Sequence, residues 1–425
     1  MNLRGQAASA AVALMCLGAP ARPALAQQNF VVKDLGTLGG TFSQAIGIND
    51  AGLVVGASTI AGDGETHAFI WSAKGGMHDL GTLGGTLSLP AGTFSLGDQP
   101  GRGINNQGHV VGVSSIAGNL ESHAFLWTPN GGMRDLGTLG GTFSQAGGIN
   151  DGGAVVGAAS VAGDTATHAF VWTKQKGMKD LGTLGGTFSR ALAASESGHV
   201  VGSSTNAANQ VHAFMWTAQG GLVDLGTLGG TFSEAFGVNE AGQVVGRSTT
   251  TGEASIHTFL WSKKTGMKDL GTLGGMFSQP SAINSAGNVV GFSTLPGEAQ
   301  FHAFLWTSCG RLKQGTGHHS SANDDPSAGA QCQRCGPAEM IDLGTLGGSF
   351  SQAMALNQSS QIVGVSNTAG DAQAHAFFWS PQSGLKDLGT LGGNFSIVLA
   401  INNRKEIAGG AALAGSGEIH AVRYR

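Results

Sequence analysis

The seven-residue phrase Asp-Leu-Gly-Thr-Leu-Gly-Gly most constrains what this chain can fold into, because it occurs eight times without a change. Successive copies start 45, 56, 45, 44, 45, 73 and 45 residues apart, so the basic period is 45. A period of about 20–50 residues predicts an array of one repeated structural unit rather than a series of different domains. The copies start at Asp34, Asp79, Asp135, Asp180, Asp224, Asp269, Asp342 and Asp387.

The two long intervals indicate insertions into the array. One falls within about residues 86–102, and the other falls within about residues 308–338. The first contains a partial copy of the repeat, Gly-Thr-Phe-Ser at 92–95. We therefore expect a single repeat domain over residues 27–425 that is interrupted twice.

One period contains four short segments with strand-like sequence. The first, 45–49, ends at an Asn-Asp-Ala-Gly turn, and the second, 53–58, is rich in β-branched residues. The third, 67–71, places His, Phe and Trp on one face by the two-residue strand period. The fourth starts at 77, and we expect Gly84-Gly85 to close it. Four antiparallel strands at this period are typical of one blade of a β-propeller.

The ends of the array indicate how such a ring would close. Residues 30–35 match the fourth strand of a unit alone, whereas residues 420–424 match the third strand, with Tyr424 at the Trp position. A first strand that completes the last unit would remove the free edges, which are an aggregation hazard. We therefore predict an all-β fold: an eight-bladed β-propeller of four-stranded antiparallel blades, closed by the N-terminal strand. A β-solenoid with two coils per period is the rival, but solenoids need polar end caps that this chain lacks.

The repeat also resembles the HAF repeat of bacterial extracellular proteins. The resemblance is carried by His-Ala-Phe-Ile-Trp at 67–71 and by Met-x-Asp-Leu-Gly-Thr-Leu-Gly-Gly at 77–85, and it extends over the whole array. Departures are Thr258 in place of Ala, Val422 in place of Phe, and Ala-Ser at 194–195 in place of Ile-Asn. The resemblance implies a secreted repeat protein and implies no activity.

The first 26 residues have the pattern of a Sec-type signal peptide. Arg4 provides a positive start, residues 7–18 are apolar, and Ala-Leu-Ala at 24–26 is a small-x-small cleavage site. No later stretch is long and apolar enough to cross a bilayer. We therefore expect a secreted or periplasmic bacterial protein without a membrane span.

Composition excludes one class of partner. Charged residues make up 11% of the chain, and the formal net charge is −4. A nucleic-acid-binding domain carries a basic patch or stripe, so nucleic acid is not an expected partner. We expect a monomer that binds an unidentified extracellular ligand, either a glycan or a protein.

The repeated His, Asp and Trp residues are expected to be structural. One His per unit cannot supply the three or four ligands that zinc needs, and one Asp per unit cannot supply the oxygens that calcium needs. The His is expected to hydrogen-bond the Asp of the phrase or a loop backbone. The Trp residues are expected to pack between blades, with stacking against sugars as the alternative. Representatives are Asp34, His67, Trp71, Asp79, His123, Trp127, His168 and Trp172.

The second insertion holds the cysteines that remain after signal cleavage, Cys309, Cys332 and Cys335. In an oxidising compartment we expect one disulfide within this insertion and one free thiol. The open alternatives are a redox pair and a zinc site that includes His318 and His319. We expect neither a metal nor a cofactor in the repeats.

Function is expected where the copies disagree. The loops between the second and third strands vary most, and we expect the first insertion to lie between the fourth strand of one blade and the first strand of the next, on the same rim. Residues unique to this region make the candidate ligand site: Glu65, Asp98, Arg102 and Glu121. The sequence contains no recognisable catalytic constellation, so we expect a non-enzymatic binding or cell-surface module. The alternatives are a propeller enzyme acting on extracellular polysaccharide and a purely structural envelope protein.

Overall fold

The prediction of an all-β chain is confirmed by the computed structural model, which describes residues 30–93, 103–308 and 338–425. Within these ranges the helical segments are two three-residue 3₁₀ turns, Ala162–Asp164 and Ala369–Asp371. None of the described helices has the length and apolar character that a membrane crossing requires.

The described strands pair antiparallel in units of four, which we number I to VIII. Unit I contains β2 (Gly39–Ile48), β3 (Val54–Ile60), β4 (Thr66–Ser72) and β5 (Gly76–Asp79). Unit II contains β6 (Gly84–Pro90), β7 (Val110–Ile116), β8 (Ser122–Thr128) and β9 (Gly132–Asp135). Unit III contains β10 (Gly140–Ile149), β11 (Val155–Val161), β12 (Thr167–Thr173) and β13 (Gly177–Asp180). Unit IV contains β14 (Gly185–Ala194), β15 (Val200–Asn206), β16 (Val211–Thr217) and β17 (Gly221–Asp224).

The remaining units follow the same order. Unit V contains β18 (Gly229–Val238), β19 (Val244–Thr250), β20 (Ile256–Ser262) and β21 (Gly266–Asp269). Unit VI contains β22 (Ser278–Ile283), β23 (Val289–Thr294), β24 (Phe301–Thr307) and β25 (Glu339–Asp342). Unit VII contains β26 (Gly347–Leu356), β27 (Ile362–Thr368), β28 (Ala374–Ser380) and β29 (Gly384–Asp387). Unit VIII contains β30 (Gly392–Ile401), β31 (Ile407–Leu413) and β32 (Ile419–Tyr424), together with β1 (Val32–Asp34).

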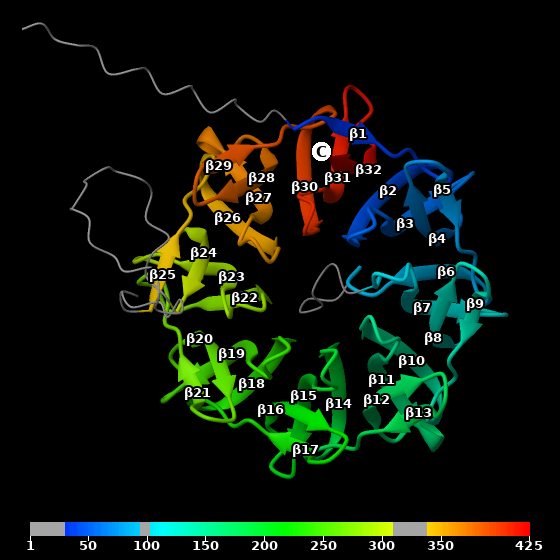
Figure 1. Ribbon diagram of the computed structural model, residues 1–425, viewed down its shortest axis with the longest axis vertical. Helices are drawn as coiled ribbons and strands as arrows, with labels where there is room; N and C mark the ends of the chain where they lie inside the picture. Colours follow the sequence, from blue (N-terminus) through cyan, green and yellow to red (C-terminus); the bar gives the residue numbers. More distant parts are fainter. Residues whose placement is uncertain (1–29, 94–102, 309–337) are drawn as a thin grey trace, which may run out of the picture.

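The units are arranged radially around a central opening (Figure 1). The first strand of each unit lies nearest the centre, and the short fourth strands of units I to VII lie at the periphery (Figure 1). The hydrogen-bonded network does not run unbroken around the centre, because the strands join into three sets of 12, 16 and 4.

The chain's first and last strands are neighbours. β1 pairs antiparallel with β32, and Lys33 lies opposite Arg423. Val31 and Arg425 extend this pairing through two backbone hydrogen bonds, in which each N–H donates to the other residue's carbonyl at 3.0 and 3.2 Å.

The first strands are longer than the sequence indicates. Gly84-Gly85 opens β6 of unit II instead of closing the fourth strand of unit I, and the first strand of unit I likewise starts at Gly39. Gly39 has φ +105°, a conformation that favours glycine, and the pairing of β2 with β3 shifts register between Gly39 and Ser43. The glycine pair therefore carries the chain into the next unit while still pairing with it.

The glycine of each Val-Val-Gly segment is required by close packing. A Cβ atom added to Gly56 would lie 2.1 Å from the carbonyl oxygen of Gln44 and 2.6 Å from the ring of Phe69. In every unit the equivalent carbonyl of the first strand would lie 1.9–2.1 Å away. The Phe of His-Ala-Phe thus packs over a glycine that no larger residue can replace. The glycines are Gly56, Gly112, Gly157, Gly202, Gly246, Gly291, Gly364 and Gly409.

The core lies between units rather than within one. Eight buried clusters are found among the described residues, and each joins neighbouring units. One contains Phe378 of unit VII and Tyr424 of unit VIII, and another contains Ala408 of unit VIII and Trp71 of unit I. Both neighbours of unit VIII are therefore packed against it through apolar surface, the main favourable term in folding.

Candidate functional site

The repeated histidines and aspartates form one hydrogen bond in each unit. Nδ1 of His67 donates to the Asp79 carboxylate at 2.8 Å, and the same carboxylate accepts the N–H of Gly81 at 2.7 Å. In unit VIII, His420 donates to Asp34 of β1 at 2.9 Å. The remaining pairs are His123–Asp135, His168–Asp180, His212–Asp224, His257–Asp269, His302–Asp342 and His375–Asp387. These hydrogen bonds hold the third strand of each unit to the turn that leads from its fourth strand into the next unit.

Two of the four candidate ligand residues, Glu65 and Glu121, lie within the described residues. Glu65 faces Nε2 of His67 at 3.1 Å, and Glu121 faces Nε2 of His123 at 3.5 Å, so each adjoins a structural pair. Asp98 and Arg102 lie outside the described residues, as do Cys309, Cys332, Cys335 and the signal segment 1–26.

The prediction that the first insertion lies on the same rim as the loops between second and third strands is wrong. The first insertion follows β6, a first strand, and does not lie between a fourth strand and the next first strand. It therefore adjoins the turns between first and second strands. The loop that carries Glu65 lies at the opposite end, where Asp63 accepts the N–H of Thr41 near the start of β2 at 2.8 Å. Strand polarity decides this, because successive antiparallel connections alternate between the two ends.

The tryptophans are packed between units and are covered by cations. Trp71, Trp127 and Trp172 are 3, 8 and 3% exposed. A basic residue of the preceding unit's fourth strand lies over the ring in four interfaces. These pairs are Lys33–Trp71, Arg134–Trp172, Lys179–Trp216 and Lys268–Trp306, at 4.8–5.3 Å. Burial and the overlying cation leave these rings little free face for sugar stacking.

One repeated serine was missed by sequence reasoning. Ser88 of β6 is fully buried, accepts the N–H of Ala68 at 2.9 Å and donates to the carbonyl of Gly81 at 2.6 Å. It thereby joins unit II to unit I. Its constancy after Gly-x-Phe or Gly-x-Leu was the available signal. The equivalents are Ser43, Ser144, Ser189, Ser233, Ser278, Ser351 and Ser396.

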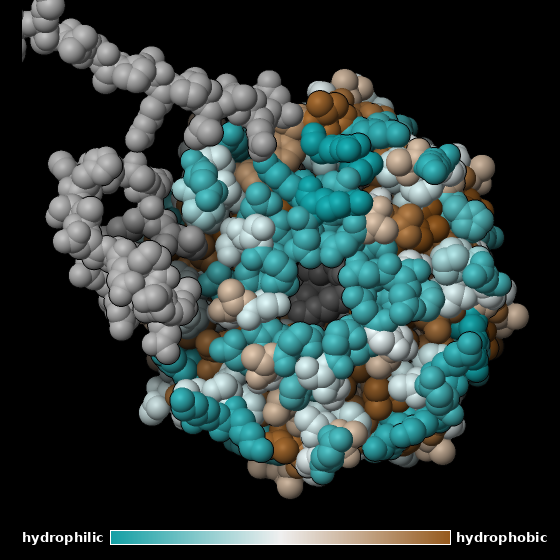
Figure 2. All heavy atoms as spheres, in the orientation of Figure 1, coloured by the Kyte–Doolittle hydropathy of each residue, from teal (hydrophilic) through white to brown (hydrophobic). Residues whose placement is uncertain are grey.

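A belt of asparagines surrounds one end of the central opening. The Asn49 side-chain amide donates to the carbonyl of Asn105 in the next unit at 3.0 Å, and Asn402 donates to Asn49 at 2.9 Å. Equivalent bonds link the other neighbours except units IV and V, where Ser195 replaces the asparagine. On the face shown in Figure 2, hydrophilic residues rim the central opening.

A cavity of about 320 Å³ lies inside this belt and contains Asp50, Asp151 and Glu196. Each carboxylate is already used, because it accepts a backbone N–H from the preceding unit. Among the described residues, no group of three or more His, Cys, Asp or Glu side chains could hold a metal ion. These carboxylates build the belt rather than a cation site.

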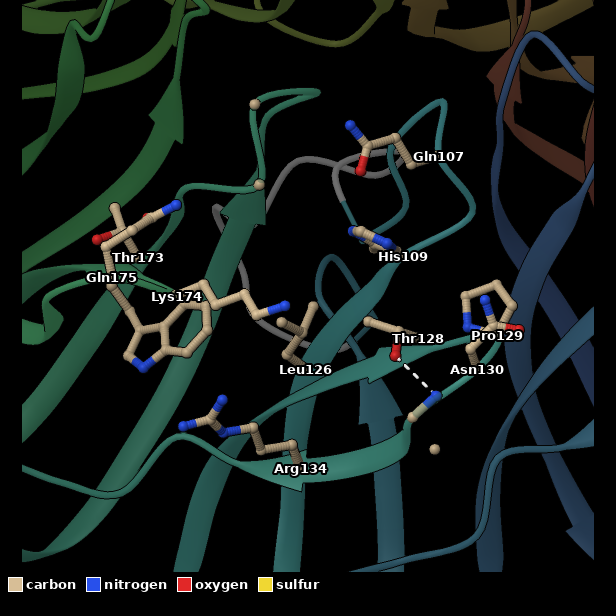
Figure 3. Close-up of a pocket in the computed structure, with 15 residues that line it drawn as sticks. Gln107, His109, Leu126, Thr128, Pro129, Asn130, Arg134, Thr173, Lys174 and Gln175 are labelled. Carbon is tan, nitrogen blue, oxygen red and sulfur yellow. Dashed lines mark hydrogen bonds between the residues drawn. The ribbon is translucent and has the colours of Figure 1, made fainter.

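A second, larger cavity lies between units II and III, and we name it the II–III groove. Its volume is about 560 Å³. His109 at the start of β7, Arg134 of β9 and the turn after β8 line one side, whereas Trp172 and Lys174 line the other. Figure 3 shows Lys174 reaching into the cavity from one side, with Gln107 and His109 facing it from the other.

The groove lies at an interface that lacks a close contact made at several other interfaces. In the preceding interface Leu53 approaches so closely that a Cβ on Gly108 would lie 3.0 Å from it. His199 approaches Gly242 in the same way, at 3.2 Å. In the II–III groove, a Cβ on Gly153 would meet nothing within 4 Å. A Cβ on Gly198 at the III–IV interface would likewise meet nothing within 4 Å, so both interfaces of unit III lack this contact.

The groove is positively charged in a chain of net negative charge. Arg134 and Lys174 line it, neither has an ion-pair partner among the described residues, and no carboxylate side chain lines it. Burial and the charge of Lys174 lower the pKa of His109, so its ring is neutral near pH 7. Its floor is apolar, because Leu126 and Trp172 are 9 and 3% exposed.

Comparison with known proteins gives no family. No family model and no curated protein matches the sequence. The β-propeller domain of the Trilobed protease from Pyrococcus furiosus is similar over 82% of this chain and 98% of that chain, at 11% identity and a TM-score of 0.45.

Two further solved structures are similar. A puromycin hydrolase mutant complexed with PGG is similar over 84% of this chain and 55% of that chain, at 13% identity and TM-score 0.45. Pyrococcus horikoshii acylaminoacyl peptidase is similar over 83% of this chain and 54% of that chain, at 10% identity and a TM-score of 0.43. The chain thus spans about half the length of these two proteins. Likenesses this low carry no inference about activity.

Proposed function

We propose that this protein is a secreted, non-enzymatic binding module that holds its ligand in the II–III groove. The proposed scaffold is an eight-bladed β-propeller of HAF repeats, closed by the N-terminal strand after removal of residues 1–26. The observation that carries the proposal is the groove itself: an open cavity of about 560 Å³ in an interface that lacks the close contact made at Gly108, Gly242 and Gly287. Ligand pockets of about 300–1,000 Å³ are typical of small-molecule sites.

Closure of the ring is supported from both neighbours of unit VIII. β1 completes this unit, and its Asp34 accepts the hydrogen bond of His420. Asn402 of unit VIII donates to Asn49 of unit I, residues that lie 353 apart in the sequence. These contacts are the same in kind as those between consecutive units, which favours one ring of eight equivalent blades.

Binding is favoured over catalysis by what lines the groove. Its charged members are Arg134 and Lys174, cationic side chains that are poor general bases. No carboxylate side chain, cysteine or serine lines the cavity, and among the described residues no hydrogen bond joins the His109 ring, which could act as a base, to the hydroxyl of Thr128 or Thr173. Two fixed cations over an apolar floor are suited to holding an anion.

The proposal is tested with a glycan array and three proteins comprising residues 27–425. These are the wild type, Arg134→Gln/Lys174→Gln, and the control Lys179→Gln/Lys268→Gln, which removes equivalent cations from two other interfaces. The wild type and the control are expected to bind the same saccharides, and the groove variant is expected to lose them. Recovered saccharides should keep their mass, since no turnover occurs. Equal binding by the groove variant, or the absence of any bound saccharide, would refute the proposal.

A further inference from the structure

We infer that the ligand of the II–III groove is an acidic saccharide, with its anionic group between Arg134 and Lys174. This inference rests on the proposed function and names its ligand class. The two cations extend from different units, Arg134 from β9 and Lys174 from the turn after β12. A single anion between them would contact both neighbouring units at once.

The two cations lack a carboxylate partner among the described residues. Arg134 lies over Trp172 with 5.3 Å between the guanidinium carbon and the ring centroid, so it is held in place without a carboxylate partner. A guanidinium donates in a planar fork that fits a carboxylate or a sulfate. Lys174 reaches into the groove toward His109 (Figure 3), and burial together with the Lys174 charge lowers the pKa of His109. An anion there would relieve the repulsion between these groups.

The uncharged side chains that line the groove are suited to a saccharide. Asn130 and Gln175 present side-chain amides, which both donate and accept hydrogen bonds, as sugar hydroxyls require. Gln107 already donates to the carbonyl of Asp151 at 2.8 Å, so its amide is held at the edge of the cavity. Leu126 and Pro129 also line the cavity and add apolar contact area beside these amides. A short acidic peptide would match the charge but would leave these neutral amides largely unused.

Calorimetric titration of the mature protein, residues 27–425, tests the inference with four probes. These are trigalacturonate, its methyl ester, a sulfated galactose trisaccharide and a triglutamate peptide. We expect one or both acidic saccharides to bind, and the methyl ester to bind at least about tenfold more weakly because a charge-assisted hydrogen bond is lost. The trigalacturonate and sulfated arms distinguish a carboxylate from a sulfate. Binding should weaken as salt is raised, since the charges are near the surface.

The variants decide whether the groove is responsible. Arg134→Gln and Lys174→Gln should each weaken binding by about tenfold or more, whereas Lys179→Gln should bind as the wild type does. Circular dichroism melting of each variant checks that the fold is kept. The inference is overturned if no acidic saccharide binds, if the methyl ester or triglutamate binds as tightly, or if Arg134→Gln and Lys174→Gln have no effect. Loss of another array ligand in the groove variant would, by contrast, leave the proposed function standing while rejecting an acidic saccharide.

Discussion

Buried hydroxyl groups and glycines explain why the repeated phrase does not vary. Each phrase runs from the Asp that accepts the histidine hydrogen bond to the glycine pair at the start of the next first strand. A buried serine three residues after the second glycine then joins the two units. At the junction of units III and IV, Ser189 is fully buried and bonded to both Ala169 and Gly182. The invariance therefore reflects assembly, and ligand recognition is expected at residues such as His109 that differ between copies.

Replacing Ser189 with Ala tests this junction. The N–H of Ala169, which Ser189 accepts at 2.7 Å, would become a buried donor without a partner. We expect the free energy of unfolding to fall by about 1–3 kcal/mol. The control Ser416→Ala removes an exposed hydroxyl and should change it by less than about 0.5 kcal/mol. Urea denaturation of both variants measures the difference, and equal stabilities would show that the buried serine is dispensable.

Replacing Gly56 with Ala tests the packing of Phe on glycine. The added Cβ would overlap the carbonyl of Gln44 and the ring of Phe69, so a strand must shift. We expect a loss of about 3 kcal/mol or more, at the upper end of overpacking effects. Gly64→Ala is the matched control, because its Cβ would meet nothing within 4 Å. If the two variants unfold at the same denaturant concentration, glycine is not required by packing.

The arrangement of strands in each unit was predictable, whereas the ends at which loops emerge were not. The segment 53–58 is β-branched and the segment 67–71 alternates, so both were recognised as strands, and the structure has Val54–Ile60 and Thr66–Ser72. The first strand was placed too late because Gly39 and Gly40 resemble a turn, and only the register shift within the strand lets them pair. That error of assignment also moved the first insertion to the wrong rim.

Carboxylates in the loops between second and third strands are predicted to make the stability of the fold decrease at low pH. Hydrogen bonds from the backbone of Ser349 and the side chain of Asn367 hold the pKa of Asp371 below its ordinary value, and hydrogen bonds also lower the pKa of Asp63 and Asp164. A depressed pKa stabilises the fold at higher pH. This contribution is present above about pH 4, the ordinary carboxyl value, and is lost as the pH falls through the lower folded value.

The triple variant with Asn at 63, 164 and 371 tests this dependence. Unit II already carries Asn119 at the equivalent position, where its side-chain oxygen accepts the N–H of Thr86 at 2.9 Å, so asparagine fits the loop. The melting temperature of the variant should fall less than that of the wild type between pH 7 and pH 3. Parallel pH profiles for the two proteins would show that these carboxylates do not contribute.

At the scale of the whole molecule, the account depends on a ring of similar interfaces, one of which contains the II–III groove. Regularity follows from the repeated serine, histidine and glycine contacts, and sequence comparison of the copies was sufficient to predict units of four strands. The II–III groove could not be predicted, because the same residue type behaves differently in two units: His199 approaches Gly242, whereas His109 leaves Gly153 without a contact. That difference is visible only once neighbouring units are placed side by side.

Deleting residues 27–36 tests the proposed closure. The deletion removes β1, the acceptor of His420 and the buried Leu35, so we expect a loss of about 3 kcal/mol or more in the free energy of unfolding. A circular permutant that carries residues 27–36 after Arg425 should regain it, because Val31 and Arg425 are already hydrogen-bonded neighbours. A deletion that melts like the parent would contradict closure by this strand.

The central claim is that ligand binds where the copies disagree and not on the axis that they share. A crystal structure of the mature protein soaked with trigalacturonate tests this most directly. The account predicts density for a sugar carboxylate between Arg134 and Lys174, inside the II–III groove. Density in the asparagine belt at Asp50 and Asp151, with the II–III groove unoccupied, would contradict it.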